Sequence, residues 1–177
     1  TARSAEARRD FVEALKDYRK ANEADPNNYR IINNLASTAL NLDMNEDALN
    51  YANKALSIKH DYGSALINGG IAQVRLGNET GAKAMFSKAV SIDPLNRQAL
   101  YNLGLIQERG NALDEAFATY KKLKDIGDSA GYLGLGRVYE KRGQRNEAMR
   151  IYRDLLAMPE AGQKSRDMAR SRISVLD

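Results

Sequence analysis

The sequence repeats itself every 34 residues, and this period limits the folds that the chain can adopt. KANEADPNN starts at Lys20 and KAVSIDPLN at Lys88, while the related phrases KALSIKHDY and KLKDIGDSA start at Lys54 and Lys122. Self-similarity at a period of 20 to 50 residues is typical of stacked repeat arrays, because one small unit cannot bury its apolar face alone. We therefore expect an elongated stack rather than one ordinary globular core.

Each repeat contains two helical patterns separated by a short break. In the unit that begins at Arg97, the break is RGNALDE, and the acidic residues after it favour the start of a second helix. The first helical face consists of Leu100, Leu103, Gly104 and Gln107, and the second of Ala116, Tyr120, Leu123 and Lys124. The proline of DPxN ends the second helix of a unit. The unit at 97–128 lacks this proline and is two residues short, so we expect an altered junction after it.

Small and aromatic residues recur at fixed places in the repeat. One place holds Ala36, Gly70, Gly104 and Gly136, another holds Ala48, Ala82, Ala116 and Ala148, and a third holds the aromatic residues Phe86, Tyr120 and Tyr152, with Tyr18 near the start of the chain. Small residues allow helices to approach closely, and a larger side chain there would separate them. We interpret the aromatic residues as core filler between helices, because helical spacing alone accounts for them.

This pattern resembles the tetratricopeptide repeat family, whose signature is W-x2-L-G-x2-Y, then A-x3-F, then P. The most similar stretch here is Tyr132-x2-Leu135-Gly136-x2-Tyr139 followed by Ala148-x3-Tyr152; further copies are Leu66-x2-Gly69-Gly70 with Ala82-x3-Phe86 and Pro94, Leu100-x2-Leu103-Gly104 with Ala116-x3-Tyr120, and a weaker unit with Ile32, Leu35, Ala36, Ala48 and Ala52. The resemblance implies an all-α fold, a right-handed α-solenoid of stacked antiparallel helix pairs.

The register of the repeat divides the chain into units of one solenoid domain. We expect a partial repeat at 1–28 that is mainly a second helix, complete repeats at 29–62, 63–96, 97–128 and 129–162, and a capping helix at 163–177. The last segment equally suits the first helix of another repeat. Too few residues precede Tyr29 for a complete pair, so we expect the sequence to be a fragment of a longer protein.

The resemblance also implies a binding site for a peptide or partner helix in the concave groove that the first helices line. The residues that this places in the groove are Asn34, Ser37, Ile67, Asn68, Ile71, Arg75, Tyr101, Asn102, Leu105, Arg109, Leu133 and Arg137. Asn34, Asn68 and Asn102 hold one position in three successive units, and an amide offers donors and an acceptor to a peptide backbone. The alternative is that asparagine is simply frequent in this chain.

The basic residues of the family's carboxylate clamp are missing here. The clamp needs lysine at the fifth position of a unit, where this chain has Asn33, Ile67, Tyr101 and Leu133. Binding to the acidic C-terminal tails of chaperones is therefore not expected. The apolar stripe of Ile67, Ile71, Tyr101, Leu105 and Leu133 favours a more hydrophobic segment or helix.

Catalytic chemistry finds little support in the sequence. There is no cysteine, which excludes disulfides and thiolate sites, and the single histidine, His60, falls in a turn between repeats. GYLGLG from Gly131 lacks the preceding strand and the GK[ST] ending of a phosphate loop. We predict a non-enzymatic protein with no cofactor and no metal. Nothing in the sequence specifies a cellular compartment.

The charge distribution leaves one alternative open. The net charge is +4, and residues 137–177 carry the whole surplus, with 10 basic and 6 acidic side chains. The alternative function is a nucleic-acid-binding repeat protein that uses Arg137, Arg142, Arg145, Arg150 and Arg153, although no aromatic cluster accompanies these arginines for stacking. The favoured function is a protein-interaction scaffold, by family analogy within a bacterial multiprotein assembly, with self-association through the terminal repeats as an additional possibility.

Overall fold

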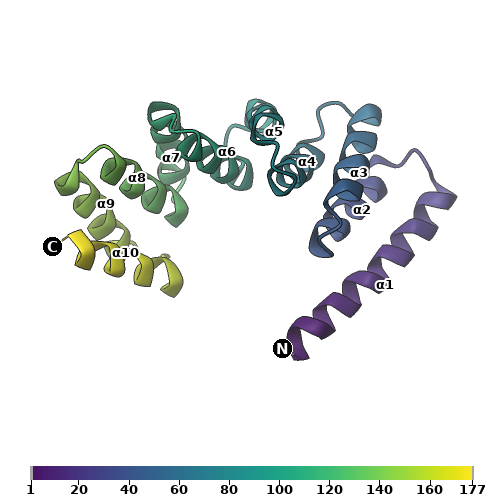
Figure 1. Ribbon diagram of the computed structural model, residues 1–177, viewed down its shortest axis with the longest axis horizontal. Coiled ribbons are helices and arrows are strands. Elements are labelled where there is room, and N and C mark those ends of the chain that lie inside the picture. Colours follow the sequence, from purple (N-terminus) through teal and green to yellow (C-terminus); the bar gives the residue numbers. More distant parts are fainter. Residues whose placement is uncertain (1, 177) are drawn as a thin grey trace. The chain divides into compact units, whose positions relative to one another are not determined.

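The computed structural model describes the backbone of residues 2–176 and the side chains from residue 7 onward. Thr1 and Asp177, the outermost residues of the expected terminal segments, lie outside this range. Within it the chain is all-α and contains ten helices and no strand (Figure 1). The helices are α1 (Ala2–Ala24), α2 (Tyr29–Asn41), α3 (Asn45–Ile58), α4 (Gly63–Arg75), α5 (Glu79–Ile92), α6 (Arg97–Arg109), α7 (Leu113–Asp125), α8 (Ser129–Lys141), α9 (Arg145–Ala157) and α10 (Gln163–Leu176).

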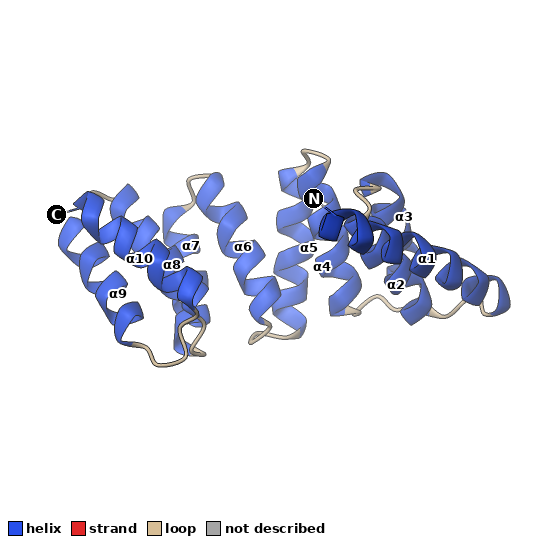
Figure 2. Ribbon diagram, turned by 90° about the horizontal axis from the view of Figure 1, so that it is seen from below, coloured by secondary structure: helices blue, strands red, loops and turns tan. Residues whose placement is uncertain are grey.

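The chain forms two compact units that divide between Asp93 and Pro94. Unit 1 contains α1 to α5 and unit 2 contains α6 to α10. In each unit, successive helices pack as hairpins, which Figure 2 shows side by side. The even-numbered helices are the first helices of the repeat, and neighbouring first helices of one unit also contact each other: α2 with α4, α6 with α8, and α8 with α10. None of the described helices is both long and apolar enough to span a membrane.

The core of each unit depends on a fit between a small residue and an aromatic ring. A Cβ atom added to Gly70, Gly104 or Gly136 on a first helix would lie 2.5, 2.6 or 2.3 Å from the rings of Phe86, Tyr120 and Tyr152 on the following helices. All three rings are fully buried, which confirms their predicted place in the core. In the repeat of α2 and α3, the corresponding residues are Ala36 and Ala52, both also fully buried. Tyr18 is only half-buried, beside Leu15.

The turn within every repeat has the same geometry. Its central residue has a left-handed backbone in all four repeats, with φ of 61° at Asp43, 81° at Gly77, 56° at Asn111 and 71° at Gly143. The next residue donates a backbone hydrogen bond of 2.9 Å to a carbonyl five residues earlier, for example Met44 to Ala39. This bond satisfies a carbonyl that the helix end leaves unpaired, as in a Schellman motif.

The junction between α7 and α8 differs from the other junctions, as predicted from the missing proline. α5 and α6 are separated by four residues that include Pro94, whereas only three residues separate α7 from α8. Gly127 adopts a φ of 74°, and Asp128 donates its backbone N–H to the carbonyl of Leu123 at 3.1 Å. The Asp128 side chain then caps α8 through the N–H of Ala130. A glycine turn of the within-repeat type thus replaces the proline turn.

Substitution of Gly70 tests the fit in the core. Gly70→Ala places a methyl group against the Phe86 ring, which is enclosed on all sides, so we expect a loss of about 2 kcal/mol in the free energy of unfolding by urea. Gly63→Ala is the control on the same helix, because no atom lies within 4 Å of its added methyl group. Gly63→Ala should leave the free energy of unfolding unchanged or raise it. Equal effects of the two substitutions would contradict this account of the core.

The left-handed turn predicts a stabilising substitution. Asn111→Gly removes the steric cost of an L-residue at a φ of 56°, so we expect the free energy of unfolding to rise by about 0.5 kcal/mol. Ala112→Gly, at the next residue with a φ of −79°, should give no gain. Urea unfolding of both variants beside the parent provides the measurement, and a stabilisation by Ala112→Gly of the same size would argue against backbone strain as the cause.

Candidate functional site

Two adjoining cavities lie in unit 2 between the first helices α6, α8 and α10. Their volumes are about 530 and 510 Å³, and they share Leu133, Arg137, Lys164 and Met168. Tyr152, Asp167, Ser171 and Arg172 complete the first cavity, and Arg97, Gln98, Tyr101, Asp128, Ala130 and Ser165 complete the second. We call the two cavities together the unit 2 groove. Their size is in the range of sites that bind ligands or side chains of a partner.

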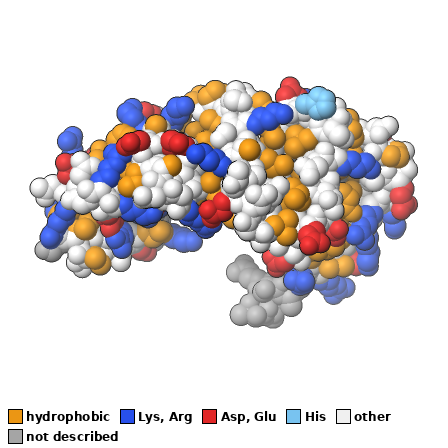
Figure 3. Space-filling view, turned by 45° about the horizontal axis from the view of Figure 1, so that its top comes forward, with side chains coloured by type: hydrophobic (Ala, Val, Ile, Leu, Met, Phe, Trp, Pro, Cys, Tyr) orange, Lys and Arg blue, Asp and Glu red, His pale blue; other side chains and the backbone are white. Residues whose placement is uncertain are grey.

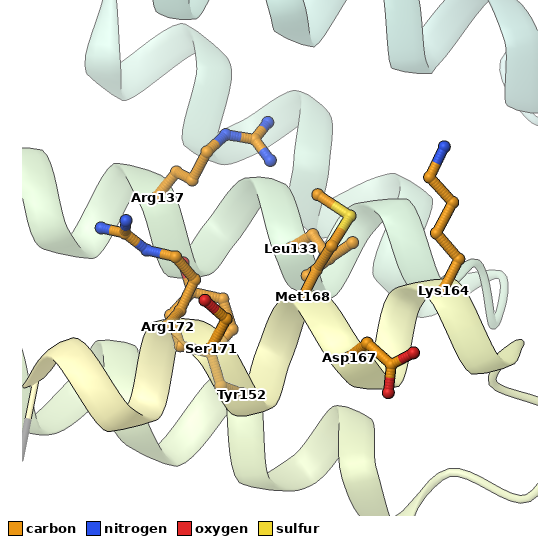
Figure 4. Close-up of a pocket in the computed structure, with 8 residues that line it drawn as sticks. All are labelled: Leu133, Arg137, Tyr152, Lys164, Asp167, Met168, Ser171 and Arg172. Atoms are coloured by element: carbon orange, nitrogen blue, oxygen red, sulfur yellow. The ribbon is translucent and has the colours of Figure 1, made fainter.

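The floor of the first cavity is apolar. Leu133 on α8 and Met168 on α10 lie beside each other in its middle, with the ring of Tyr152 behind them (Figure 4). Met168 is 45% exposed, so part of its apolar side chain is open to a partner. In the second cavity, Tyr101 on α6 adds an aromatic ring that is 41% exposed. Exposed apolar surface in a concave site favours contact with apolar groups of a partner.

The wall formed by α10 was not predicted as part of the site. Lys164, Asp167, Met168 and Ser171 occupy the second, fifth, sixth and ninth places counted from Gln163, the first residue of α10. These are the places that the family resemblance assigns to the groove in the complete repeats. Continuing the repeat register by one more helix would therefore have identified them. The contact of α10 with α8 corresponds to that of α8 with α6.

A buried carboxylate connects α6, α7 and α8. Glu108 is 7% exposed and accepts hydrogen bonds from the Tyr120 hydroxyl at 3.0 Å and from the Arg137 guanidinium at 2.9 and 3.2 Å. Lys141 lies 3.3 Å from the other oxygen of the same carboxylate. Burial by itself would raise the pKa of Glu108, but Arg137, Tyr120 and Lys141 outweigh it, so the pKa lies below its ordinary value and the group is ionised at neutral pH.

A second, equivalent cluster connects α8, α9 and α10. Glu140 accepts a hydrogen bond of 2.5 Å from the Tyr152 hydroxyl and two from the Arg172 guanidinium, one of them at 3.1 Å. Burial acts to raise the pKa of Glu140, and its bonds to Arg172 and Tyr152 lower it below the ordinary value. For both tyrosines, burial and the neighbouring carboxylate raise the pKa, so each hydroxyl remains a donor. The two clusters hold Arg137 and Arg172 at one end of the first cavity (Figure 4).

The other predicted groove residues of unit 2 lie at its margin or outside it. The structure brings Tyr101, Leu133 and Arg137 together in the cavities. Asn102 is half-buried and donates its amide to the carbonyl of Gln98 at 2.9 Å, one helical turn back. Leu105 is half-buried and Arg109 is exposed, and neither lines the two cavities of the unit 2 groove.

In unit 1 the predicted residues lie on the neighbouring first helices α2 and α4. Asn68 donates its amide to the side-chain oxygen of Asn33 at 3.0 Å, which links the two helices. Arg75 donates to the carbonyl of Leu40 at 2.5 Å and to Asp43 at 3.3 Å. Ile67 is buried, while Asn34, Ser37 and Ile71 are half-buried. Asn68 and Arg75 therefore already serve contacts between adjacent repeats.

On the face of unit 2 that Figure 3 shows, basic side chains are interspersed with acidic ones. Two of the arginines proposed for nucleic acid have intramolecular partners: Arg137 binds Glu108, and Arg142 binds Asp114 and lies over the ring of Phe117 at 5.0 Å. His60 is exposed in the turn before α4, and its imidazole bonds the carbonyl of Leu56 at 2.8 Å. Among residues 7–176, no group of three or more His, Asp or Glu side chains is arranged to hold a metal ion.

Comparison with known families identifies the repeat. Models described as tetratricopeptide repeat match three consecutive stretches, 29–62, 67–131 and 132–165. These stretches include all of the helices from α2 to α9 except residues 63–66 at the start of α4.

Curated proteins are similar in sequence to part of this chain. It is 34% identical over 90 residues to the protein STIP1 homolog of Dictyostelium discoideum. The aligned stretch covers 51% of this chain and 16% of that protein. The chain is 29% identical over 120 residues to DnaJ homolog subfamily C member 7 of Mus musculus, covering 68% of this chain and 23% of that protein. The chain thus spans less than a quarter of the length of these relatives.

Solved structures share the fold. A crystal structure of MamA superposes with a TM-score of 0.77 at 26% identity, covering 88% of this chain and 86% of that one. PilW, described as a widely conserved type IV pilus biogenesis factor, superposes with a TM-score of 0.80 over 99% of this chain and 83% of its own, at 24% identity. The second likeness is one of fold alone.

The Glu108 cluster predicts a pH-dependent contribution to stability. Because the pKa of Glu108 is lowered in the folded state, its stabilising effect is complete above the pKa of the unfolded chain and is lost as pH falls through the folded value. Glu108→Gln leaves Arg137 without its carboxylate and should cost about 3 kcal/mol at pH 7. The difference from the parent should shrink as pH falls from 7 toward 3, because the parent loses the stabilising effect of its ionised Glu108 as pH drops below the pKa of the unfolded chain.

Urea unfolding across this pH range measures the effect. Glu160→Gln, in the exposed loop before α10, is the matched control and should show no such pH-dependent difference. A constant cost of Glu108→Gln from pH 7 to pH 3 would show that its charge is not what stabilises the cluster.

Proposed function

The chain belongs to the tetratricopeptide repeat family, and we propose that it is a non-enzymatic protein-interaction scaffold that binds a peptide or a partner helix in the unit 2 groove. The observation that carries the proposal is the open apolar floor between α8 and α10, where Leu133 and Met168 meet. An apolar side chain of a partner would bury this surface, at a gain of about 25 cal/mol for each Å² removed from water.

The groove is built on rigid elements, which favours binding without a large ordering cost. Its side chains project from the packed helices α6, α8, α9 and α10, with the exception of Asp128, which caps α8. The Glu108 and Glu140 clusters hold Arg137 and Arg172 before a partner arrives. Side chains that are already ordered lose less conformational freedom on binding.

The first helices of unit 1 form part of the same proposal. Asn34, Ser37 and Ile71 are half-buried on α2 and α4 and offer polar and apolar contacts. Participation in a larger bacterial assembly remains the setting that we propose for the protein. A nucleic-acid partner is less well supported, because Arg137 and Arg142 are paired with Glu108 and Asp114.

A peptide-display selection tests the proposed function. We expect that the chain enriches peptides from a random-sequence phage library and that Met168→Gln weakens binding of the selected synthetic peptides about tenfold, because a polar amide replaces the apolar floor. Fluorescence anisotropy gives the dissociation constants, and circular dichroism checks that the variant keeps its helices.

The matched control is Ala118→Gln, which adds the same amide at an exposed position of α7, outside both cavities. It should bind the peptides as the parent does. Selected peptides that bind the parent and Met168→Gln equally would place their site outside the unit 2 groove.

A further inference from the structure

The charges around the unit 2 groove are unevenly compensated. Arg97 faces Asp128 at 3.5 Å, and Arg172 is paired with Glu140, so each of these cations has one carboxylate. Asp167 is already bound by Arg170 at 3.2 Å and by the amide of Gln163 at 2.8 Å. These groups contribute little net charge to the cavities.

Two cations remain in excess. Arg137 and Lys141 share the single carboxylate of Glu108, which leaves one positive charge surplus at that end of the first cavity. Lys164 lines both cavities, is exposed, and forms no ion pair or side-chain hydrogen bond within the described residues. Figure 4 shows its side chain on the other side of Met168 from the two guanidinium groups. The apolar floor therefore lies between two positively charged edges.

A cation that has no carboxylate partner and lies beside an apolar surface favours binding partners of a particular charge. Complementary charges at the rim of an interface speed association and exclude partners of the wrong sign. The ammonium group of an exposed lysine at the rim of an interface stays hydrated until a carboxylate of the partner approaches. The ion pair between the two groups therefore forms without a large desolvation cost. Basic residues beside the apolar group of a partner would meet like charges at both ends of the floor.

From this arrangement, and resting on the proposed function, we propose that the unit 2 groove selects a protein segment with an apolar side chain flanked by acidic residues. The apolar side chain lies on Leu133 and Met168, and a neighbouring carboxylate pairs with Lys164. A second carboxylate on the other side of the anchor faces Arg137 and Arg172. This arrangement differs from recognition of a terminal carboxylate, because the central contact is apolar and internal to the segment.

Competitive selection tests the proposal. Three peptide-display libraries with randomised apolar central positions and flanking positions fixed as Glu, Gln or Lys are mixed in equal amounts and offered to the full chain. We expect enrichment of the Glu-flanked library and, for its synthetic peptides, about tenfold tighter binding than for the Lys-flanked counterparts, with the difference reduced at high salt.

Variants separate charge recognition from apolar recognition. Lys164→Gln should weaken the Glu-flanked peptides about threefold to tenfold and leave the Gln-flanked peptides unchanged, whereas Lys122→Gln, at an exposed lysine of α7 outside the cavities, should change neither. Lys164→Glu should narrow the preference for Glu-flanked over Lys-flanked peptides further than Lys164→Gln does, because it makes one edge of the floor acidic and leaves the edge at Arg137 and Arg172 basic. Each of these results supports the proposed charge selection.

The opposite outcomes are distinguishable. Enrichment that depends on Met168 but is equal for the three libraries, or insensitive to Lys164→Glu, would overturn the charge selection and leave the proposed function standing. Absence of any Met168-dependent enrichment would overturn both. A Lys164-dependent preference for single-stranded DNA over all peptides, measured in the same anisotropy assay, would assign the cationic edges to nucleic acid and also overturn the proposal.

Discussion

The close fit between a small residue on the first helix and an aromatic ring on the second is the contact on which each repeat depends. Gly104 and Gly134, on the neighbouring helices α6 and α8, both lie against the ring of Tyr120, so one side chain connects two first helices. A close-packed interior tolerates neither a void nor an extra methyl group at such a contact. The paired alanines at 36 and 52 satisfy the same constraint with smaller volumes on the second helix.

In unit 2 the same aromatic position also has a polar role. The hydroxyls of Tyr120 and Tyr152 donate to Glu108 and Glu140, and each carboxylate binds an arginine of the next first helix. The corresponding repeat in unit 1 has Phe86, which lacks a hydroxyl, and Val74 in the place of the glutamate. Burying a carboxylate is costly without partners, so tyrosine, glutamate and arginine occur together or not at all.

Much of this structure could be predicted from the period of the sequence. Helix pairs, the burial of Phe86, Tyr120 and Tyr152, and the altered junction at Gly127 all follow from local spacing and from turn chemistry. The site was predicted less completely. Tyr101, Leu133 and Arg137 do line the cavities, but Met168 and Lys164 belong to the segment 163–177, which was interpreted as a capping helix or equally as the first helix of another repeat, so no groove residue was predicted in it.

The sequence by itself determined the helices, their turns and the residues of each core, since these depend on contacts between residues near one another in the repeat. Only the tertiary structure decided which polar groups are available to a partner. Arg137 and Lys164 are similar as cations in the sequence, yet one is held by a buried glutamate from the preceding repeat and the other is exposed without a carboxylate among the described residues. That difference depends on side chains about 30 residues apart, whose pairing a local pattern does not encode.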